Sequence, residues 1–488
     1  MKNKSIVKNY IYNLIFLFFK TLGPFLITPY VSRALGENGI GKYSFSYSIV
    51  TYFILFAALG FHNYAQRLVA SHQGNRKQQS IDFWEIFFAR LIPAILTLVV
   101  YFVLVLKNVY GEKYNTLLLL FSFEVIAVIF DITFFLQGNE EFGKTVSVGI
   151  VVKLASYLCM FIFVKNEQDL WKYVLIQSLS VILTNVIMWI YLPKYIERID
   201  INELKVVRHL PATIILFLPT IATSIYTSLD KILIGLITKS DAQNGNYEYA
   251  EKIVKMALTF ITALGSVLIP RNSKQFAEGD IKGLRENIYE STQFVFFLGV
   301  PFMFGCIVIA DSFVPWFLGP NFPTAAKIMK ILSPIIVIIG LSDLFGLQFL
   351  IPTNQDKKYT EAIVVGSISN LIFNILLIPK IGAFGAAIAT VIAETFVTAT
   401  MLYFIRNDIS FIMVLKRSWK FWISGLIMFI ICTLLSKYII DKTIENIIIV
   451  FIGCFVYMLM LLLLKDAFLY KVINKILKEM KKFINHSA

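Results

Sequence analysis

The sequence predicts an all-α polytopic membrane protein with about 14 transmembrane helices. Of its 488 residues, 57% are hydrophobic and only 16% are charged, whereas soluble domains carry about 25% charged residues. The mean hydropathy is +0.72. Apolar runs of about 20 residues, the length that one helix needs to cross a bilayer, recur along the whole chain. The segments between these runs are too short to fold as separate domains.

The first expected span begins close to the N-terminus. A basic segment leads into an apolar run, as in a signal peptide, but the run continues past Pro24 and Pro29, which favours a retained helix. The two prolines remove helix hydrogen bonds and predict a bend that suits a gate, with a static kink as the alternative. The spans are expected at residues 10–31, 43–61, 82–106, 116–136, 145–164, 171–192, 210–237, 249–270, 289–310, 326–350, 359–379, 383–405, 419–437 and 445–464.

Lysine and arginine are unevenly distributed over the segments between the spans. If the N-terminus is cytoplasmic, the cytoplasmic segments hold more than twice as many of these residues as the outer segments. The positive-inside rule therefore predicts that both termini lie in the cytoplasm. The formal net charge of +14 is explained mainly by this topology, so binding to nucleic acid is not expected.

Two weak internal similarities predict a duplicated unit. The segments Gly41–Val50 and Gly245–Val254 agree at four of ten positions and open the second and eighth spans. Asp131 and Asp343 are each followed by a Phe-Leu pair and a short polar loop. Chance similarity is the alternative. Because the repeated unit has an even number of spans, the repeat would be parallel. The predicted divisions are a six-helix lobe at 1–193, a cytoplasmic linker at 194–209, a second six-helix lobe at 210–405, two additional helices at 406–465 and a cytoplasmic amphipathic tail at 466–488.

Acidic residues within the spans each allow two interpretations. A charge at mid-bilayer costs about 2.5–3.5 kcal/mol on insertion scales, so such residues normally face the protein interior. Glu124 and Asp131 are seven residues apart and are expected on one face of a helix. There they either bind a coupling ion or pair with Arg90 or Lys153. Glu394 is isolated, and we expect it either to bind a proton or sodium or to be hydrogen-bonded in the core.

Several basic residues within the spans have no acidic partner on their own helix. Lys20 and Lys153 are alone, and Arg90 lies on a different side of its helix from Glu85. These cations need partners from other helices, from water or from a ligand.

The eighth span differs, because each of its lysines follows a glutamate by four residues. Glu248 precedes Lys252, and Glu251 precedes Lys255, at the spacing of helical ion pairs. These four residues either neutralise one another near the outer interface or present charge to a ligand.

The sequence shows none of the motifs of a cofactor-dependent or metal-dependent enzyme. No nucleotide-binding glycine loop and no nucleophile triad occurs, and we expect no cofactor, no metal and no enzymatic activity. The cysteines lie in apolar runs without metal-ligand spacing, at Cys159, Cys306, Cys432 and Cys454.

Four local motifs, in order along the chain, carry a resemblance to a known family. They are Ser32–Tyr43 after the first span, Phe134–Phe142 after the fourth, Ser228–Gly235 in the seventh and Leu268–Arg271 at the end of the eighth. Together they resemble the Wzx-type polysaccharide-unit flippases of the multidrug/oligosaccharidyl-lipid/polysaccharide exporter superfamily. The match extends over residues 5–405.

This resemblance implies two six-helix lobes around a central cavity that opens alternately to each side of a bacterial inner membrane. The expected substrate is an undecaprenyl-diphosphate-linked oligosaccharide, moved to the outer leaflet for capsule, O-antigen or exopolysaccharide synthesis. Membrane lipids, a polysaccharide polymerase and glycosyltransferases are the expected partners. Basic side chains in a wet cavity can replace water around the diphosphate. The expected substrate-binding residues are Lys20, Arg33, Arg90, Lys153, Lys231, Lys252 and Lys255. Ion coupling is expected at Glu124, Asp131 and Glu394, and gating at Pro24 and Pro29.

Three other functions compete with this one. A lipid II flippase of the same superfamily often has fourteen spans, which leaves the glycan open. A multidrug or cation antiporter shares the fold, but acids should then dominate its cavity. A membrane-embedded polymerase or glycosyltransferase needs a sizeable outer loop with catalytic residues, and the outer loops expected here are short.

Overall fold

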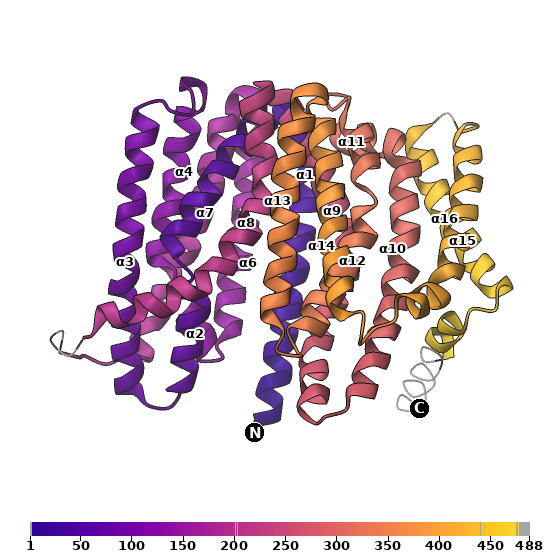
Figure 1. The fold of residues 1–488 in the computed structure, drawn as a ribbon. Coiled ribbons are helices and arrows are strands. Elements are labelled where there is room, and N and C mark those ends of the chain that lie inside the picture. Colours follow the sequence, from indigo (N-terminus) through magenta and orange to yellow (C-terminus); the bar gives the residue numbers. More distant parts are fainter. Residues whose placement is uncertain (1, 201, 203, 440, 475–476, 478–488) are drawn as a thin grey trace, which may run out of the picture. The chain divides into compact units, whose positions relative to one another are not determined.

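The computed structural model describes residues 2–200, 202, 204–439, 441–474 and 477. The side chains of residues 2–22, and of several residues in the eighth and ninth helices, lie outside this description. All regular elements within the described ranges are helices (Figure 1). The predicted all-α membrane fold is confirmed.

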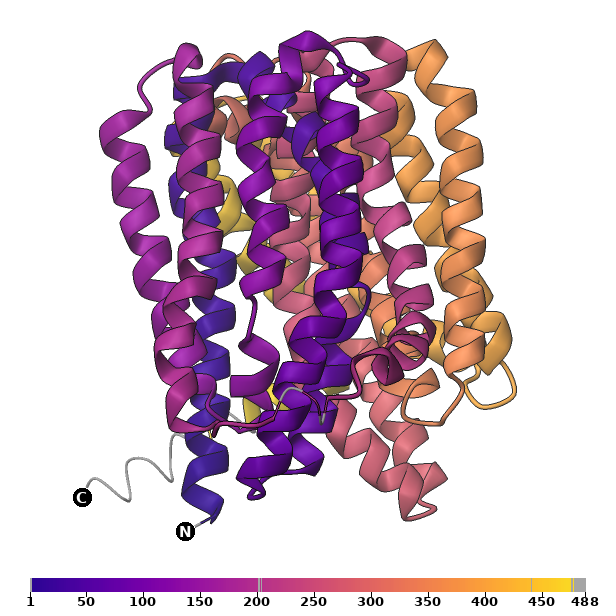
Figure 2. The same ribbon diagram turned by 90° about the vertical axis from the view of Figure 1, so that its left-hand side faces the viewer.

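Contacts divide the chain into two compact units, Met1–Glu248 and Tyr249–Ala488. In unit 1 the long helices run side by side, with the N-terminus and the turn between α2 and α3 at the same end (Figures 1 and 2). Its helices are α1 (Lys2–Ala58), α2 (Phe61–Ser71), α3 (Arg76–Leu106), α4 (Glu112–Phe130), α5 (Thr133–Gly138), α6 (Phe142–Phe163), α7 (Leu170–Met188) and α8 (Leu210–Thr238). Short 3₁₀ turns lie at Glu167–Asp169 (η1), Trp189–Lys194 (η2) and Val206–His209 (η4).

Unit 2 holds most of α9 (Asp241–Ala277) and all later helices. These are α10 (Ile281–Leu318), α11 (Ala325–Leu332), α12 (Ile335–Phe345), the π-helical turn η5 (Gly346–Leu350), α13 (Asp356–Ile381), α14 (Ala383–Ile405), α15 (Phe411–Ser436) and α16 (Lys442–Leu463). The two additional helices, α15 and α16, pack on α10 and on each other. The contact-based boundary at 248/249 assigns α8 to unit 1, whereas the sequence places it in the second lobe; the predicted lobes remain a prediction.

Eleven of the described helices are long and apolar enough to cross a membrane. Every predicted span falls on helical segments, but the first two lie on the single long element α1. The helices α8 and α9, which carry the seventh and eighth predicted spans, are not among the eleven. The number fourteen therefore stays a prediction. Exposed apolar side chains follow one another along α3, with Ile92 50%, Leu96 65% and Leu106 72% exposed. Such exposure is expected for a helix surrounded by lipid.

Side-chain caps fix where several helices begin. Asn75 accepts a hydrogen bond from the Gln78 amide at the start of α3, and Asp441 accepts two from the amides of Thr443 and Ile444 at the start of α16. These caps satisfy amides that have no partner within the first turn of a helix.

The backbone of α1 leaves helical geometry at Gly36, where φ is 64° and ψ is 179°. Pro24 and Pro29 lie within the helical stretch before it. Glycine adopts this left-handed φ without a steric penalty from a Cβ atom. The irregularity between the first two predicted spans therefore lies at Gly36, several residues after the prolines that the sequence singled out.

Two glycines, Gly41 in the motif Ser32–Tyr43 and Gly245 in the similar segment Gly245–Val254, lie against the main chain of another helix. A Cβ atom on Gly41 would lie 1.7 Å from the carbonyl oxygen of Asp241, and one on Gly245 would lie 2.0 Å from the carbonyl oxygen of Glu37. The two contacts are reciprocal, since each glycine meets the residue four places before the other. Ser44 and Glu248, three places after each glycine, are hydrogen-bonded at 2.9 Å. The two similar segments thus pack against each other at equivalent positions.

Two predicted spans are divided in the structure, since 326–350 falls on α11, α12 and η5, and 116–136 falls on α4 and α5. The fourth expected span, 116–136, ends as α4 at Phe130, and Asp131 is extended with φ −70° and ψ 107°. Its carboxylate accepts hydrogen bonds from the amide (2.8 Å) and hydroxyl (2.5 Å) of Thr133, at the start of α5. Asp131 directly follows the last residue of α4, and the expectation that it shares one helix face with Glu124 stays a prediction.

Candidate functional site

A polar cluster lies in unit 1 where α1, α4 and α7 contact one another. Its acidic member is Glu124 on α4, which is 5% exposed and accepts a hydrogen bond of 3.4 Å from Ser178 on α7. Lys153 on α6 interacts electrostatically with Glu124 and lies 5.5 Å from the ring centre of Tyr157. No ion pair or hydrogen bond between Glu124 and Lys153 is present in the described part of unit 1, and the pairing stays a prediction.

Three tyrosine rings pack against one another in the same cluster. Tyr43 and Tyr47, one turn apart on α1, stack with ring centres 5.6 Å apart. Tyr173 meets the Tyr43 ring edge-on at 5.1 Å, and the amide of Gln177 donates a hydrogen bond of 2.8 Å to the Tyr43 hydroxyl. The cluster therefore presents phenol, amide and carboxylate groups from three helices.

Lys231 on α8 extends the cluster through an ion pair. Its ammonium lies 2.6 Å from the carboxylate of Glu248, and their side chains are 16% and 18% exposed. Ser44 donates a hydrogen bond of 2.9 Å to the same carboxylate. The neighbouring Asp230 accepts a hydrogen bond of 2.6 Å from Tyr247 instead. Lys231 is therefore partly buried and neutralised in this arrangement.

Arg90 lies in the same unit but outside this cluster. It is 3% exposed, and its guanidinium donates hydrogen bonds to the carbonyls of Ile129 (2.8 Å) and Asp131 (2.5 Å) at the end of α4. It also lies 5.5 Å from the ring centre of Phe134. Carbonyls at a helix C-terminus carry partial negative charge and lack partners within the helix. This geometry favours a structural role for Arg90 over contact with a substrate.

The remaining predicted bases are dispersed. Arg33 is exposed and donates a hydrogen bond of 2.9 Å to the carbonyl of Pro29 on its own helix. Lys255 pairs with Glu251 at 2.6 Å, as its spacing predicts. Lys252 lies 5.3 Å from the ring centre of Tyr249. The side chain of Lys20 lies outside the described residues.

Glu394 on α14 is 5% exposed. Within the described part of unit 2, its carboxylate has no hydrogen bond or ion pair. An unpaired carboxylate in a membrane-spanning helix is costly when ionised. The prediction of a proton or cation site at this residue is therefore compatible with its surroundings.

Sequence reasoning missed the tyrosines, Ser44 and Gln177. One signal was available, because the second expected span opens with Tyr43-Ser-Phe-Ser-Tyr-Ser48, an unusual density of hydroxyl groups for a membrane helix. Their convergence with Gln177 depends on the packing of α1 against α7, which periodicity alone does not determine.

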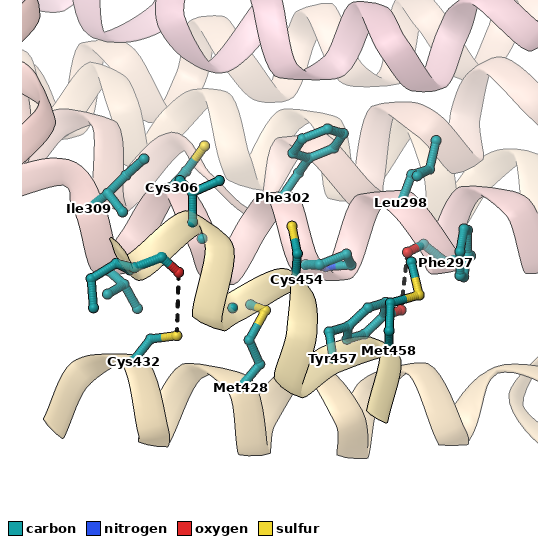
Figure 3. Close-up of a pocket in the computed structure, with 16 residues that line it drawn as sticks. Phe297, Leu298, Phe302, Cys306, Ile309, Met428, Cys432, Cys454, Tyr457 and Met458 are labelled. Carbon is teal, nitrogen blue, oxygen red and sulfur yellow. Dashed lines mark hydrogen bonds between the residues drawn. The ribbon is translucent and has the colours of Figure 1, made fainter. Parts of the chain in front are cut away.

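An apolar cavity of about 280 Å³ lies in unit 2 between α10, α15 and α16 (Figure 3). Phe302 and Cys306 on α10 line it together with Met428 and Cys454 on the two C-terminal helices. Gly305 faces open space, since no atom lies within 4 Å of the position of an added Cβ. The cavity has the chemistry of a hydrocarbon-binding site.

Known proteins resemble the chain over most of its length. A family model described as "Polysaccharide biosynthesis protein" matches residues 6–276. The putative O-antigen transporter of Escherichia coli K12 is 25% identical over 409 residues, which cover 83% of this chain and 97% of the relative.

Two solved structures have a similar fold. A lipid II flippase MurJ, in an inward closed conformation, aligns with a TM-score of 0.70 and 16% identity over 94% of this chain and 99% of that chain. An inward-facing multidrug resistance transporter of the MATE family, in the MOP superfamily, aligns with a TM-score of 0.64 and 12% identity over 82% and 98%. The resemblance stated from the motifs is confirmed.

Proposed function

Because the chain belongs to the polysaccharide biosynthesis protein family, we propose that it moves undecaprenyl-diphosphate-linked oligosaccharide units from the cytoplasmic to the outer leaflet of a bacterial inner membrane. The observation that carries this proposal is the similarity to the putative O-antigen transporter, which extends over 97% of that relative. The uneven distribution of lysine and arginine supports cytoplasmic termini. A polymerase and glycosyltransferases would act on either side of this step.

The physical difficulty of this transport lies in the charged and hydroxylated headgroup. An isolated ion has an idealised Born cost of tens of kcal/mol in a medium of low dielectric constant, so the diphosphate needs polar partners throughout its passage. The cluster around Glu124 supplies phenol, amide and hydroxyl groups at the contact of three membrane helices. We propose that these groups contact the sugars, because they can both donate and accept hydrogen bonds.

We propose that Lys231 contacts the diphosphate by exchanging one anionic partner for another. In the structure its ammonium is neutralised by Glu248 at 2.6 Å, and a phosphate oxygen can take the place of this carboxylate. Lys153 interacts electrostatically with Glu124, and we propose that it acts together with Lys231. Arg33, Lys252, Lys255 and Lys20 remain candidates from the sequence. Arg90 is left out of the binding set because the end of α4 occupies its guanidinium.

The lipid tail needs no polar partner. We propose that one segment of the isoprenoid chain enters the apolar cavity of unit 2 while the headgroup crosses. Coupling is proposed at Glu394, where binding of a proton or a cation would remove the cost of an unpaired buried carboxylate.

The experiment that tests the function is headgroup translocation in vesicles containing the purified protein. A fluorescent undecaprenyl-diphosphate oligosaccharide is placed in one leaflet, and its accessibility to a reductant added outside is followed over time. We expect the protein to accelerate translocation over empty vesicles, and Lys231→Gln to slow it more than Lys327→Gln, a matched change in an exposed lysine. Lipid II and a cationic dye are tested in parallel. Transport of the dye without transport of either glycolipid would exclude the proposal.

A further inference from the structure

A second pocket lies in unit 1, away from the polar cluster. It is formed by the first half of α3 and by the irregular connection between η2 and η4, and its volume is about 500 Å³. The side chains that matter here are Trp84, Phe88, Glu197 and Arg198. The pocket lining thus combines two half-buried aromatic side chains with an exposed carboxylate and an exposed guanidinium.

Side chains of α3 hold the near end of this connection in place. Arg76 donates hydrogen bonds to the carbonyls of Pro193 (3.4 Å) and Ile196 (3.0 Å). The hydroxyl of Ser80, which is 0% exposed, accepts a hydrogen bond of 2.9 Å from the amide of Glu197. These bonds engage the main chain and leave the Glu197 side chain available.

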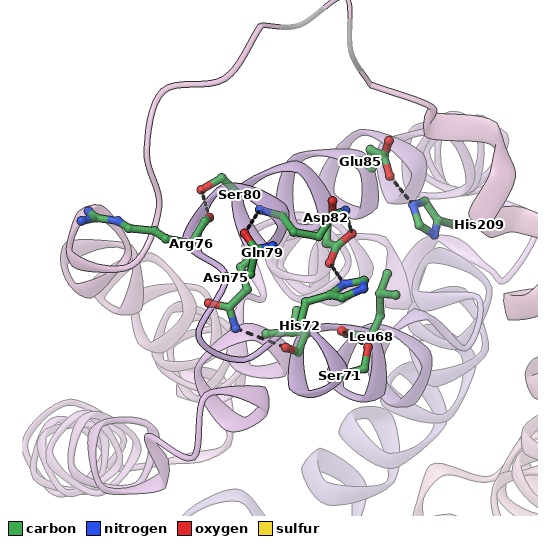
Figure 4. Close-up of polar contacts among 12 residues, drawn as sticks. Leu68, Ser71, His72, Asn75, Arg76, Gln79, Ser80, Asp82, Glu85 and His209 are labelled. Carbon is green, nitrogen blue, oxygen red and sulfur yellow. Dashed lines mark hydrogen bonds and ion pairs between the residues drawn. The ribbon is translucent and has the colours of Figure 1, made fainter.

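The far end is held by Glu85, which is 1% exposed. Its carboxylate accepts a hydrogen bond of 2.6 Å from the amide of Lys205 and lies 2.6 Å from Arg208 and 2.8 Å from His209. Figure 4 shows His209 directed at Glu85. These hydrogen bonds and ion pairs hold both ends of the connection against α3, and the pocket lies between the two held ends.

The pocket lies at the edge of the lipid-exposed part of α3. Exposed aliphatic side chains begin at Ile92, which is 50% exposed. With a rise of 1.5 Å per residue, Trp84 and Phe88 lie about 12 and 6 Å before this point. In membrane proteins, tryptophan concentrates at the interface, where phospholipid headgroups lie.

The two charged side chains that line the pocket have no partner among the described residues. The side chains of Glu197 and Arg198 form no ion pair or hydrogen bond with another residue in the described ranges. Two neighbouring opposite charges that do not pair with protein groups match a ligand that carries both signs. The aromatic rings match the apolar part of the same ligand.

We propose that this pocket binds a zwitterionic phospholipid with a primary ammonium group, such as phosphatidylethanolamine. Arg198 binds the phosphate, Glu197 accepts hydrogen bonds from the ammonium, and the glycerol and upper acyl chain lie against Trp84 and Phe88. A choline headgroup has no N–H to donate to Glu197, and a glycerol headgroup leaves this carboxylate without a cation. The site is independent of the transported substrate.

The test measures thermal stability and lipid retention of the full chain in detergent. Phosphatidylethanolamine, phosphatidylcholine and phosphatidylglycerol with identical acyl chains are added in turn, and retained lipids are counted by native mass spectrometry. We expect phosphatidylethanolamine to raise Tm by about 2–4 °C more than the other two lipids. Retention should show one additional tightly held molecule.

Three variants distinguish the contacts. Glu197→Gln should abolish the preference for phosphatidylethanolamine over phosphatidylcholine, whereas Arg198→Gln should weaken retention of all three lipids. Lys194→Gln, an exposed change in the same connection that does not line the pocket, should leave both readouts unchanged. Equal stabilisation of the wild type by the three lipids, or an unaltered preference in both pocket variants, would overturn the proposal.

Discussion

At the scale of single residues, two kinds of functional position can be distinguished. Residues of the first kind contact main-chain atoms and hold the helices together, whereas residues of the second kind carry side chains that can contact a ligand. Gly41 and Gly245 belong to the first kind, because each lies against a main-chain carbonyl that leaves no room for a side chain. Arg90 is of the same kind, since it completes the hydrogen bonding at the end of α4. Lys231 and Glu124 belong to the second kind.

Replacing Gly41 by alanine should destabilise unit 1. The added Cβ would lie 1.7 Å from the Asp241 carbonyl oxygen, so the backbones of α1 and α9 would have to separate. Overpacking of this kind costs about 1–3 kcal/mol. The change is measured as a lower Tm and a lower yield of monodisperse protein. Gly305→Ala, where the new atom meets nothing within 4 Å, is the matched control, and equal stability of the two variants would refute this account.

Replacing Arg90 by methionine should lower the yield of folded protein and its Tm, in addition to any loss of transport. The change leaves two buried carbonyls without donors, at about 1–3 kcal/mol for each. Fluorescence-detected size exclusion and Tm report the loss. Lys107→Met, at an exposed position directly after α3, is the control and should leave both measurements nearly unchanged. A normal Tm combined with lost transport in Arg90→Met would instead return this residue to the substrate-binding set.

At the scale of elements, side chains of α3 determine the path of the connection that follows α7. Among its described residues, 195–200 and 204–205 belong to no regular element. It is nevertheless held at both ends, through Arg76 and Ser80 at one end and through Glu85 at the other. His72 contributes to the same region, with Nδ1 2.5 Å from the carboxylate of Asp82 (Figure 4).

Glu85→Ala should release the far end of this connection. Arg208, His209 and the Lys205 amide would lose a shared charged acceptor. Each hydrogen bond to a charged group contributes about 1.5–3 kcal/mol, so we expect local opening, and with it trypsin cleavage in this connection, to become about tenfold faster or more. Glu112→Ala, at an exposed position in the first turn of α4, provides the control. Cleavage at the wild-type rate would show that Glu85 does not hold the connection.

The two additional C-terminal helices create a second feature at this scale. By packing on α10 they enclose the apolar cavity (Figure 3). Gly305→Phe should occupy part of this space, because an added Cβ meets nothing within 4 Å and Gly305 lines the cavity. If the isoprenoid tail enters there, translocation of the long-chain substrate should fall several-fold while Tm is preserved. A short-chain analogue should be affected less; unchanged transport of both substrates would remove the tail from this site.

At the scale of the whole molecule, the family and the membrane fold are established, whereas the energy source is a proposal. Glu394→Gln mimics a permanently protonated side chain. Translocation by this variant should no longer respond to an imposed proton or sodium gradient, although passive exchange in vesicles can continue. Thr395→Ala, at the adjacent exposed position, should keep the response. A full response in Glu394→Gln would move the coupling site elsewhere.

The sequence by itself determined the class of the molecule and much of its local structure. Apolar runs of bilayer length fall on helices because a membrane segment must satisfy its backbone hydrogen bonds internally. The four ordered motifs were sufficient to indicate the family. The i,i+4 pair of Glu251 and Lys255 was also predictable, because helical spacing alone brings the two side chains together.

Only the tertiary structure decided which partners neutralise the buried charges. Lys231 and Glu248 are seventeen positions apart on different helices, and Arg90 is matched by main-chain carbonyls, which no residue pattern reveals. The fourth expected span likewise ends as α4 at Phe130, and periodicity did not indicate this end. Periodicity describes the faces of one helix, whereas the neutralisation of a buried charge depends on which atoms of other helices come within a hydrogen-bond length of it.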